Sequence, residues 1–144
     1  MKKQACSFLA IASLIAMFSV APTQAQTNRL IAASVPFNFV IGDRTLPAGE
    51  YVFVLVQAGG SDTVKIQSRD GHITAFVLTR AGRVKASQAE PKLVFNRYAD
   101  QYFLSQVYGL EESTTQQLAK PRAEDRLAKM AAEKKNVSIA ANKR

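Results

Sequence analysis

The sequence predicts a mainly β protein, a small antiparallel β-sandwich or barrel-like domain followed by a C-terminal α-helix. Three observations support this fold class. Several segments place apolar and β-branched residues with the two-residue period of strands. Pro-Ala-Gly and Asp-Gly turn signatures separate these segments. Two segments are apolar on both faces, and a sandwich or barrel covers both faces of such strands.

The first 25 residues have the pattern of an export signal. Lys2 and Lys3 precede an apolar run over residues 5–20, and small residues stand before a cleavage point between Ala25 and Gln26. The run is shorter than the roughly 20 residues that a membrane-spanning helix needs. We therefore expect Sec export, a periplasmic or extracellular location, and no transmembrane segment after cleavage.

The mature chain offers few groups for metal or covalent chemistry. The one cysteine, Cys6, lies in the predicted leader, so we expect no disulfide and no thiolate metal site. His72 is the single histidine, which excludes a cluster of imidazole ligands. We expect no cofactor and no metal site.

The first predicted strand covers residues 35–41, VPFNFVI. Val35, Phe37, Phe39 and Ile41 share one face, as in a half-buried strand. Pro36 lacks an amide donor, which favours the start of a strand or the edge of a sheet.

A corner and a central strand follow. The stretch from Leu46 to Gly49 places Pro47 second and glycine fourth in a type I turn, which we interpret as a structural bend. Residues 51–57, YVFVLVQ, are apolar on both faces and predict a strand in the middle of the sheet. Glu50 precedes this strand, and we expect it to be a solvated strand end rather than a catalytic acid.

Asp70 and Gly71 predict a two-residue type I′ turn between two strands. The corresponding register pairs Arg69 with His72, Ser68 with Ile73, and Ile66 with Ala75. In this register one face of the hairpin is apolar and consists of Val64, Ile66, Ile73, Ala75 and Val77. Phe76 and Leu78 are left on the polar face, where we expect another element to cover them. His72, beside the turn, is expected to be solvated rather than a general base.

Residues 92–108 predict a second hairpin whose two faces are both apolar. One face carries Leu93, Phe95, Tyr102, Leu104 and Tyr108, and the other carries Val94, Tyr98, Phe103 and Val107. Strands of this kind need cover on two sides.

The chain divides into a β-rich domain over residues 26–119, a basic helix over residues 120–136 and a disordered tail over residues 137–144. Pro121 suits a helix start, and acidic residues follow in the first turn. The apolar stripe of this helix is thin and consists of Ala123, Leu127, Met130 and Ala131. A helix of this length is marginal alone in water, so it either docks weakly through the stripe or frays.

Three stretches, VPFNFVIGDRTLPAGEY, LVFNRYADQYFLSQV and LAKPRAEDRLA, together resemble a family of small exported bacterial proteins with no assigned activity. The resemblance covers most of residues 35–128 and implies export and a β-rich fold, with no catalytic residues to carry over. The chain departs from the family pattern at Ala99, where glycine is usual, and at Pro121, where serine is usual. Ala99 disfavours a type I′ turn and favours a four-residue loop, whereas Pro121 removes a side-chain cap.

The positive charge is concentrated in the last segment. Residues 26–119 hold nine basic and eight acidic residues, whereas residues 120–144 hold eight basic and three acidic ones. The candidate polyanion-binding residues are Lys120, Arg122, Arg126, Lys129, Lys134 and Lys135. No aromatic residue follows Tyr108, so base stacking on this segment is not available and nucleic acid is an unlikely partner.

These observations favour a noncatalytic exported protein that acts as a binding or interaction module in the cell envelope, with an unknown envelope protein as its partner. The alternative is binding of an anionic envelope surface or polyanion through the basic segment. A hydrolase that uses carboxylates is the less favoured alternative, because paired carboxylates are a property of the fold and not of the sequence.

Overall fold

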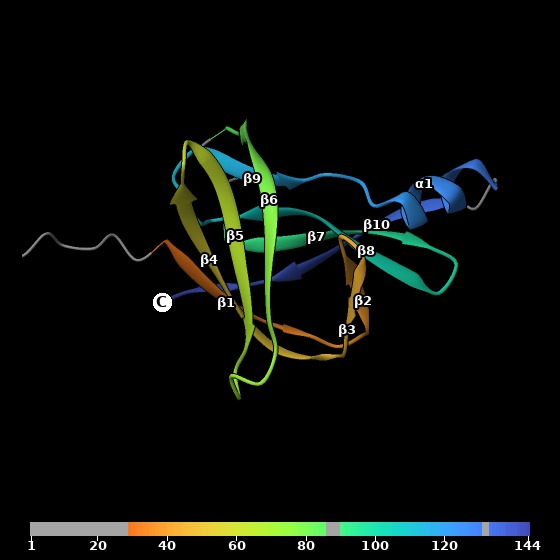
Figure 1. Cartoon of the computed structure of the whole chain (residues 1–144), viewed down its shortest axis with the longest axis horizontal. Coiled ribbons are helices and arrows are strands. Elements are labelled where there is room, and N and C mark those ends of the chain that lie inside the picture. The colour runs from red at the N-terminus through yellow and green to blue at the C-terminus, as the bar shows by residue number, and fades with distance from the viewer. Residues whose placement is uncertain (1–28, 86–89, 131–132) are drawn as a thin grey trace, which may run out of the picture.

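The computed structural model describes residues 29–85, 90–130 and 133–144. Within them, eleven strands form one sheet, accompanied by one short helix, so the mainly β fold class is confirmed (Figure 1). The predicted cleavage point between Ala25 and Gln26 lies outside the described residues. The elements are β1 (Leu30–Val35), β2 (Phe39–Ile41), β3 (Arg44–Leu46), β4 (Gly49–Ala58), β5 (Ser61–Ser68), β6 (Thr74–Arg83), β7 (Lys92–Tyr98), β8 (Gln101–Tyr108), β9 (Thr114–Leu118), α1 (Arg122–Lys129), β10 (Lys134–Ala140) and β11 (Asn142–Lys143).

The last strands of the chain close the sheet into a barrel-like domain. The strand order is β10-β7-β8-β9-β6-β5-β4-β1-β11, and its two end strands are separated in sequence by Ala141 alone. β10 runs antiparallel to β7, and β11 runs antiparallel to β1 on the opposite edge. The C-terminal segment therefore joins the two edges that the rest of the sheet leaves open.

The predicted strand over residues 35–41 is two strands with a bend between them. β1 ends at Val35 and β2 begins at Phe39, because Pro36 has no amide to continue a ladder. The buried face is as predicted, since Val35, Phe39 and Ile41 are buried and Phe37 is half-buried.

The Pro-Ala-Gly stretch is a structural corner, where the chain leaves the short β2–β3 hairpin and enters β4. The Tyr51 hydroxyl donates to the Pro47 carbonyl at 2.7 Å, and the Ala48 amide donates to the Asn38 side chain at 3.0 Å. β4 pairs with β1 on one side and β5 on the other, so its central position is confirmed.

The register of the β5–β6 hairpin is confirmed, but the predicted turn type is wrong. Ile66 pairs with Ala75, and the Ser68 amide donates to the Ile73 carbonyl at 2.9 Å. A type I′ turn needs positive φ at both central residues, and of the Asp70-Gly71 pair only Gly71 has it. The Asp70 carboxylate instead accepts bonds from the Ser68 hydroxyl and the His72 amide, which stabilises a wider loop.

The β7–β8 hairpin also departs from expectation. Tyr98 pairs with Gln101, so the loop has two residues and not the predicted four. Ala99 adopts a φ of 50°, the left-handed conformation that glycine accepts more readily. The Arg97 side chain donates to the Ala99 carbonyl at 2.8 Å, which holds the tight turn in place.

Both faces of this hairpin carry buried side chains, as predicted, but the predicted division of the faces is wrong for Val107. The register shifts between Val94 and Phe95, which places Val107 on the face of Leu93. Leu93, Phe95, Leu104 and Val107 belong to the single core cluster inside the sheet. Phe37 and Phe39 pack edge-on against Phe95, with ring centroids 5.2 and 5.5 Å apart respectively. On the opposite face, the Asn96 and Tyr98 side chains donate hydrogen bonds to Glu124 of α1.

Two predictions for the C-terminal segment are wrong. The helix spans Arg122–Lys129 rather than residues 120–136, and residues 137–144 include strand structure rather than a disordered tail. Val137, Ile139 and Ala141 are half-buried and alternate with exposed residues, which is the two-residue period of a strand. The pairing with β7 and β1 satisfies backbone groups that a free tail would leave to water.

The helix docks mainly through a carboxylate, and of the predicted apolar stripe Leu127 is half-buried whereas Ala123 is exposed. Glu124 is 1% exposed and accepts hydrogen bonds from the Asn96 amide at 2.7 Å and the Tyr98 hydroxyl at 3.4 Å. Met130, by contrast, is 77% exposed. Pro121 precedes the helix with no side-chain cap, as expected from the missing serine.

Candidate interaction surface

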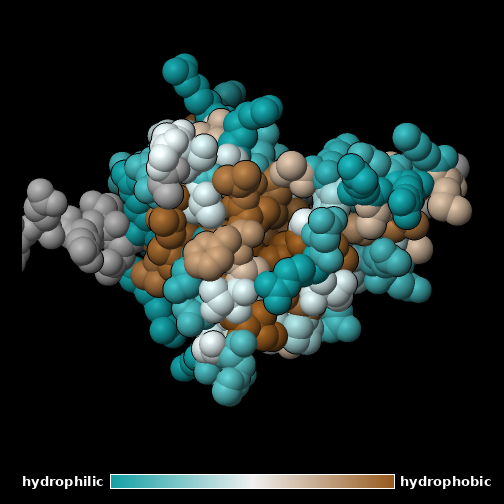
Figure 2. Space-filling view, in the orientation of Figure 1, coloured by the Kyte–Doolittle hydropathy of each residue, from teal (hydrophilic) through white to brown (hydrophobic). Residues whose placement is uncertain are grey.

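The outward face of strands β4, β5 and β6 carries an apolar patch, which we name the β4–β6 face. Its apolar members are Val52, Val54 and Val56 on β4, with Phe76 and Leu78 on β6. These residues alternate with the inward side chains of the same strands, so they point away from the core. Figure 2 shows hydrophobic atoms gathered on the side where β5 and β6 face the viewer in Figure 1.

No described element covers the two β6 side chains, contrary to expectation. Phe76 is 66% exposed and Leu78 is 68% exposed. Across the ladder, Phe76 lies opposite Lys65 and Leu78 lies opposite Thr63. The β4–β6 face is therefore a solvent-facing apolar strip with a cation between its outer strands.

A hollow lies at one end of this face, where β6 and β9 begin to pair. It has a volume of about 260 Å³ and is lined by residues 78–80 of β6 and residues 117–119 at the end of β9. Leu78 contributes to both the hollow and the apolar strip, so the two features are continuous.

The candidate polyanion-binding residues are all exposed. Four of them flank or lie on α1, and Lys134 and Lys135 begin β10, where they pair with Tyr98 and Arg97 of β7. Figure 1 shows α1 and the start of β10 at the same end of the molecule as the β7–β8 turn. We name this region the basic end.

Acidic neighbours reduce the positive charge of the basic end. Glu133 pairs with Lys135 at 3.6 Å, and Asp100 pairs with Arg97 at 3.8 Å. These carboxylates also line a hollow of about 300 Å³ with both cations. The basic end is thus a mixed surface with a positive excess.

The residues considered for catalysis lie at a different end of the sheet. Glu50 forms an ion pair with Arg69, and this hydrogen-bonded guanidinium lowers the pKa of the Glu50 carboxyl below its usual value. The side chain therefore stays ionised at neutral pH, which is unfavourable for a general acid. His72 is exposed in the loop between β5 and β6.

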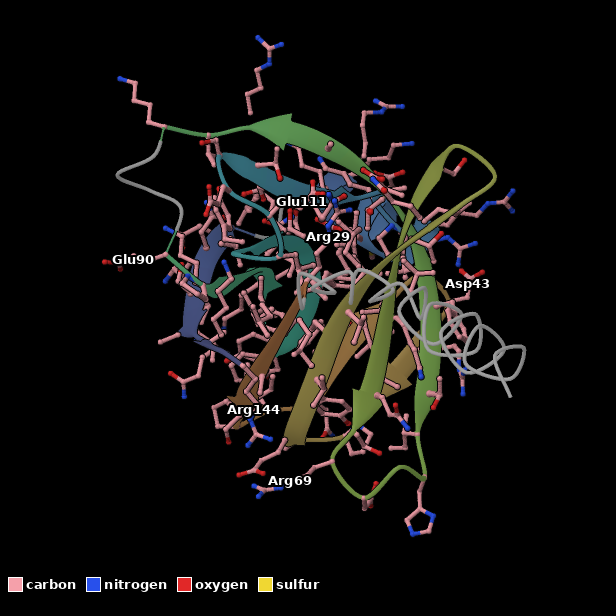
Figure 3. All side chains as sticks on the ribbon, turned by 90° about the vertical axis from the view of Figure 1, so that its left-hand side faces the viewer. Arg29, Asp43, Arg69, Glu90, Glu111 and Arg144 are labelled. Atoms are coloured by element: carbon pink, nitrogen blue, oxygen red, sulfur yellow. The ribbon has the colours of Figure 1, made fainter. Side chains whose placement is uncertain are left out.

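A further hollow, of about 260 Å³, includes this ion pair in its lining, together with residues of β1 and β4 and with Ala140, Asn142 and Arg144. Figure 3 shows Arg69 and Arg144 close to one another at this end, whereas Arg29 and Glu111 lie together elsewhere. Arg29 pairs with Glu111 at 2.9 Å and ties the start of β1 to the segment after β8.

The buried cluster of Glu124, Asn96 and Tyr98 was not predicted from the sequence. Burial raises the pKa of the Tyr98 hydroxyl, and the neighbouring Glu124 carboxylate raises it further. The cluster has all its side-chain polar atoms satisfied, and it attaches α1 to the sheet. Pro121, Glu124 and Leu127 follow an i, i+3 spacing, which is the spacing of residues on one buried helix face. This face was not predicted because Glu124 is charged.

Among residues 29–85, 90–130 and 133–144, no three metal-ligating side chains come together. Within the same residues, no helix has the length and hydropathy that crossing a bilayer requires. Comparison with protein-family models, curated proteins and solved structures finds no match for this chain.

Proposed function

We propose that this chain is a noncatalytic exported protein of the bacterial cell envelope that binds a partner protein through the β4–β6 face. The observation that carries the proposal is the exposure of Phe76 and Leu78 side by side on one strand, on the same outward face as the valines of β4. Contiguous apolar surface of this kind on a folded domain is typical of a binding site.

The energetic argument rests on the area that a partner would remove from water. Fully burying a side chain such as phenylalanine or leucine contributes about 1.5–3 kcal/mol. Phe76 and Leu78 retain two thirds of their exposure, so covering both supplies about 2–4 kcal/mol. Each of the two side chains therefore supplies about 1–2 kcal/mol, which is more than most residues of an interface contribute.

The test compares retention of envelope proteins by the immobilised mature chain and by a Phe76→Ser, Leu78→Ser variant. Met130→Ser is the matched control, because it removes an exposed apolar side chain at the other end of the molecule. We expect one component to be retained by the parent and the control, and lost by the double variant. Equal retention of that component by all three proteins contradicts the proposal, as does retention by none.

A second candidate function, binding of an anionic surface or polyanion, is supported by the exposure of all six candidate cations at or near the basic end. An Arg126→Gln, Lys129→Gln variant tests it by heparin and anionic-vesicle retention. Substitution is preferable to truncation after Ala119, which would also remove the strand that closes the sheet. Retention equal to that of the parent removes this candidate.

Export, the envelope location and membership of the family of small exported bacterial proteins are parts of the same proposal. They are supported by the leader pattern before Gln26 and by the three stretches quoted above. Recovery of the chain from the periplasm with Gln26 as its first residue is the expected result, and cytoplasmic recovery of the uncleaved chain contradicts it.

A further inference from the structure

β6 changes its partner strand part-way along its length. It pairs with β5 from Thr74 to Thr79 and with β9 from Thr79 to Arg83. Over residues 74–78, β5 is the one described strand beside it. The first half of β6 is therefore open on the side that faces away from β5.

Hydrogen bonds along β6 show which backbone groups face this edge. The Ile73 carbonyl accepts from Ser68 on the β5 side, whereas the Val84 amide donates to Ser113 on the β9 side. In an antiparallel strand, the backbone groups of successive residues face opposite neighbours. The even-numbered residues of β6 consequently direct their N–H and C=O groups away from β5.

The backbone groups of Phe76 thus face the open edge. The Thr74 carbonyl on the same side accepts a bond from the Arg44 guanidinium at 3.3 Å, so β3 reaches this edge through one side chain. No described strand pairs with the Phe76 amide and carbonyl. An unpaired strand edge that also carries exposed apolar side chains is a template for another strand.

We propose that the Thr74–Leu78 edge of β6 binds an extended peptide segment of the partner by strand addition. The backbone of the segment pairs with Phe76, and its alternate apolar side chains lie against Phe76 and Leu78 on the β4–β6 face. This inference rests on the proposed function and specifies how the partner is held.

The charges around the edge favour an acidic segment over a second copy of this chain. Arg44 reaches the edge at the Thr74 carbonyl, and Arg80 lies one outward position beyond Leu78; both side chains are exposed. Neither cation forms an ion pair with any described residue. Two copies joined edge to edge would bring like charges together, whereas acidic residues in a partner strand would pair with them.

The probe is a blocked hexapeptide of sequence Val-Thr-Val-Thr-Glu-Thr, titrated against the protein by NMR. In an extended segment its valines and its glutamate share one face, which matches the outward face of Phe76, Leu78 and Arg80. A second peptide has the same sequence with alternate backbone nitrogens methylated, which removes its pairing edge and keeps its side chains. A third replaces glutamate with lysine. We expect binding of the first peptide, at least tenfold weaker binding of the other two, and shifts centred on residues 74–78.

Two protein variants separate backbone pairing from side-chain contact. Phe76→Pro removes the outward amide without breaking a bond to β5, because proline is tolerated on the free side of an edge strand. Phe76→Ser removes the ring and keeps the amide. We expect Phe76→Pro to abolish binding and Phe76→Ser to weaken it. The melting curve of each variant verifies that it is folded. If Phe76→Pro does not fold, the comparison of the methylated and unmodified peptides decides whether the backbone of β6 pairs with the segment.

Equal binding of the methylated and unmodified peptides overturns strand addition while leaving the β4–β6 face as the binding surface. No binding of any peptide at millimolar concentration overturns the acidic-segment assignment, and the envelope-retention comparison tests the proposed function separately. A concentration-dependent dimer that Phe76→Pro dissociates identifies the occupant as a second copy and also overturns the assignment.

Discussion

Replacing the inward side chains of β10 should destabilise the whole domain, because this strand closes the sheet. The change is Val137→Ser with Ile139→Ser, which removes two half-buried apolar side chains from the strand that pairs with β7. Full burial of such a side chain contributes about 1.5–3 kcal/mol, so half-burial of each supplies about 1 kcal/mol. The pair should lower the free energy of unfolding by about 2 kcal/mol.

For a small domain, a loss of about 2 kcal/mol lowers the melting temperature by roughly 8–16 °C. The assay is thermal unfolding of residues 26–144 followed by circular dichroism. The control is Ser138→Ala with Ala140→Ser, since these side chains are exposed on the same strand and should shift stability by less than about 0.5 kcal/mol. If the inward and outward pairs melt at the same temperature as the parent, β10 does not close the sheet and the reasoning is refuted.

Three further changes test particular parts of the fold. Ala99→Gly should stabilise the protein by about 1 kcal/mol, because glycine adopts the left-handed conformation of the β7–β8 turn with less strain than alanine does. An unchanged midpoint of denaturant unfolding would argue against that turn. Gly109→Ala should destabilise it, because a Cβ there would lie 2.7 Å from the Pro91 Cα and φ is +88°; chemical denaturation that matches the parent's would contradict this packing. Because the folded pKa of Tyr98 is raised above its unfolded value near 10, its contribution to stability is present below about pH 10 and lost as the pH rises further. Melting temperatures between about pH 8 and 11 should therefore fall less steeply in Tyr98→Phe than in the parent, and parallel curves would rule out this burial.

Periodicity predicted the parts of this fold in which one face is apolar and the other polar. The register between Ile66 and Ala75 followed from the hydrophobic pattern, because a slip by one residue would expose the buried set. Turn types were predicted less well. The Asp70 side chain bonds locally to Ser68 and His72, and such competition from a side chain overrides the dipeptide preference.

The C-terminal strand was missed because its sequence signal is short and lies among charges. Val137, Ile139 and Ala141 alternate correctly, but the segment is exposed on its other face and follows a basic helix. What makes it a strand is the presence of two open edges, on β7 and β1, which are remote in sequence. Tertiary pairing of this kind decides strand formation more strongly than local propensity.

The candidate surface was partly visible in the sequence. Phe76 and Leu78 stood out as apolar residues on a polar face, and the structure leaves them exposed. The open edge beside them was not visible, because it depends on where β9 stops pairing with β6. A site that forms where two strands separate can be predicted only when the strand topology is known in addition to the residue pattern.

Amide hydrogen exchange along β6, measured by NMR on the mature protein, tests the open edge most directly. Ala75 and Val77 direct their amides toward β5, whereas Phe76 directs its amide toward the edge. We predict that the Phe76 amide exchanges at least roughly tenfold faster than the amides of both neighbours. Protection of the Phe76 amide equal to that of Ala75 and Val77 would show that the edge is already paired, and would contradict the account.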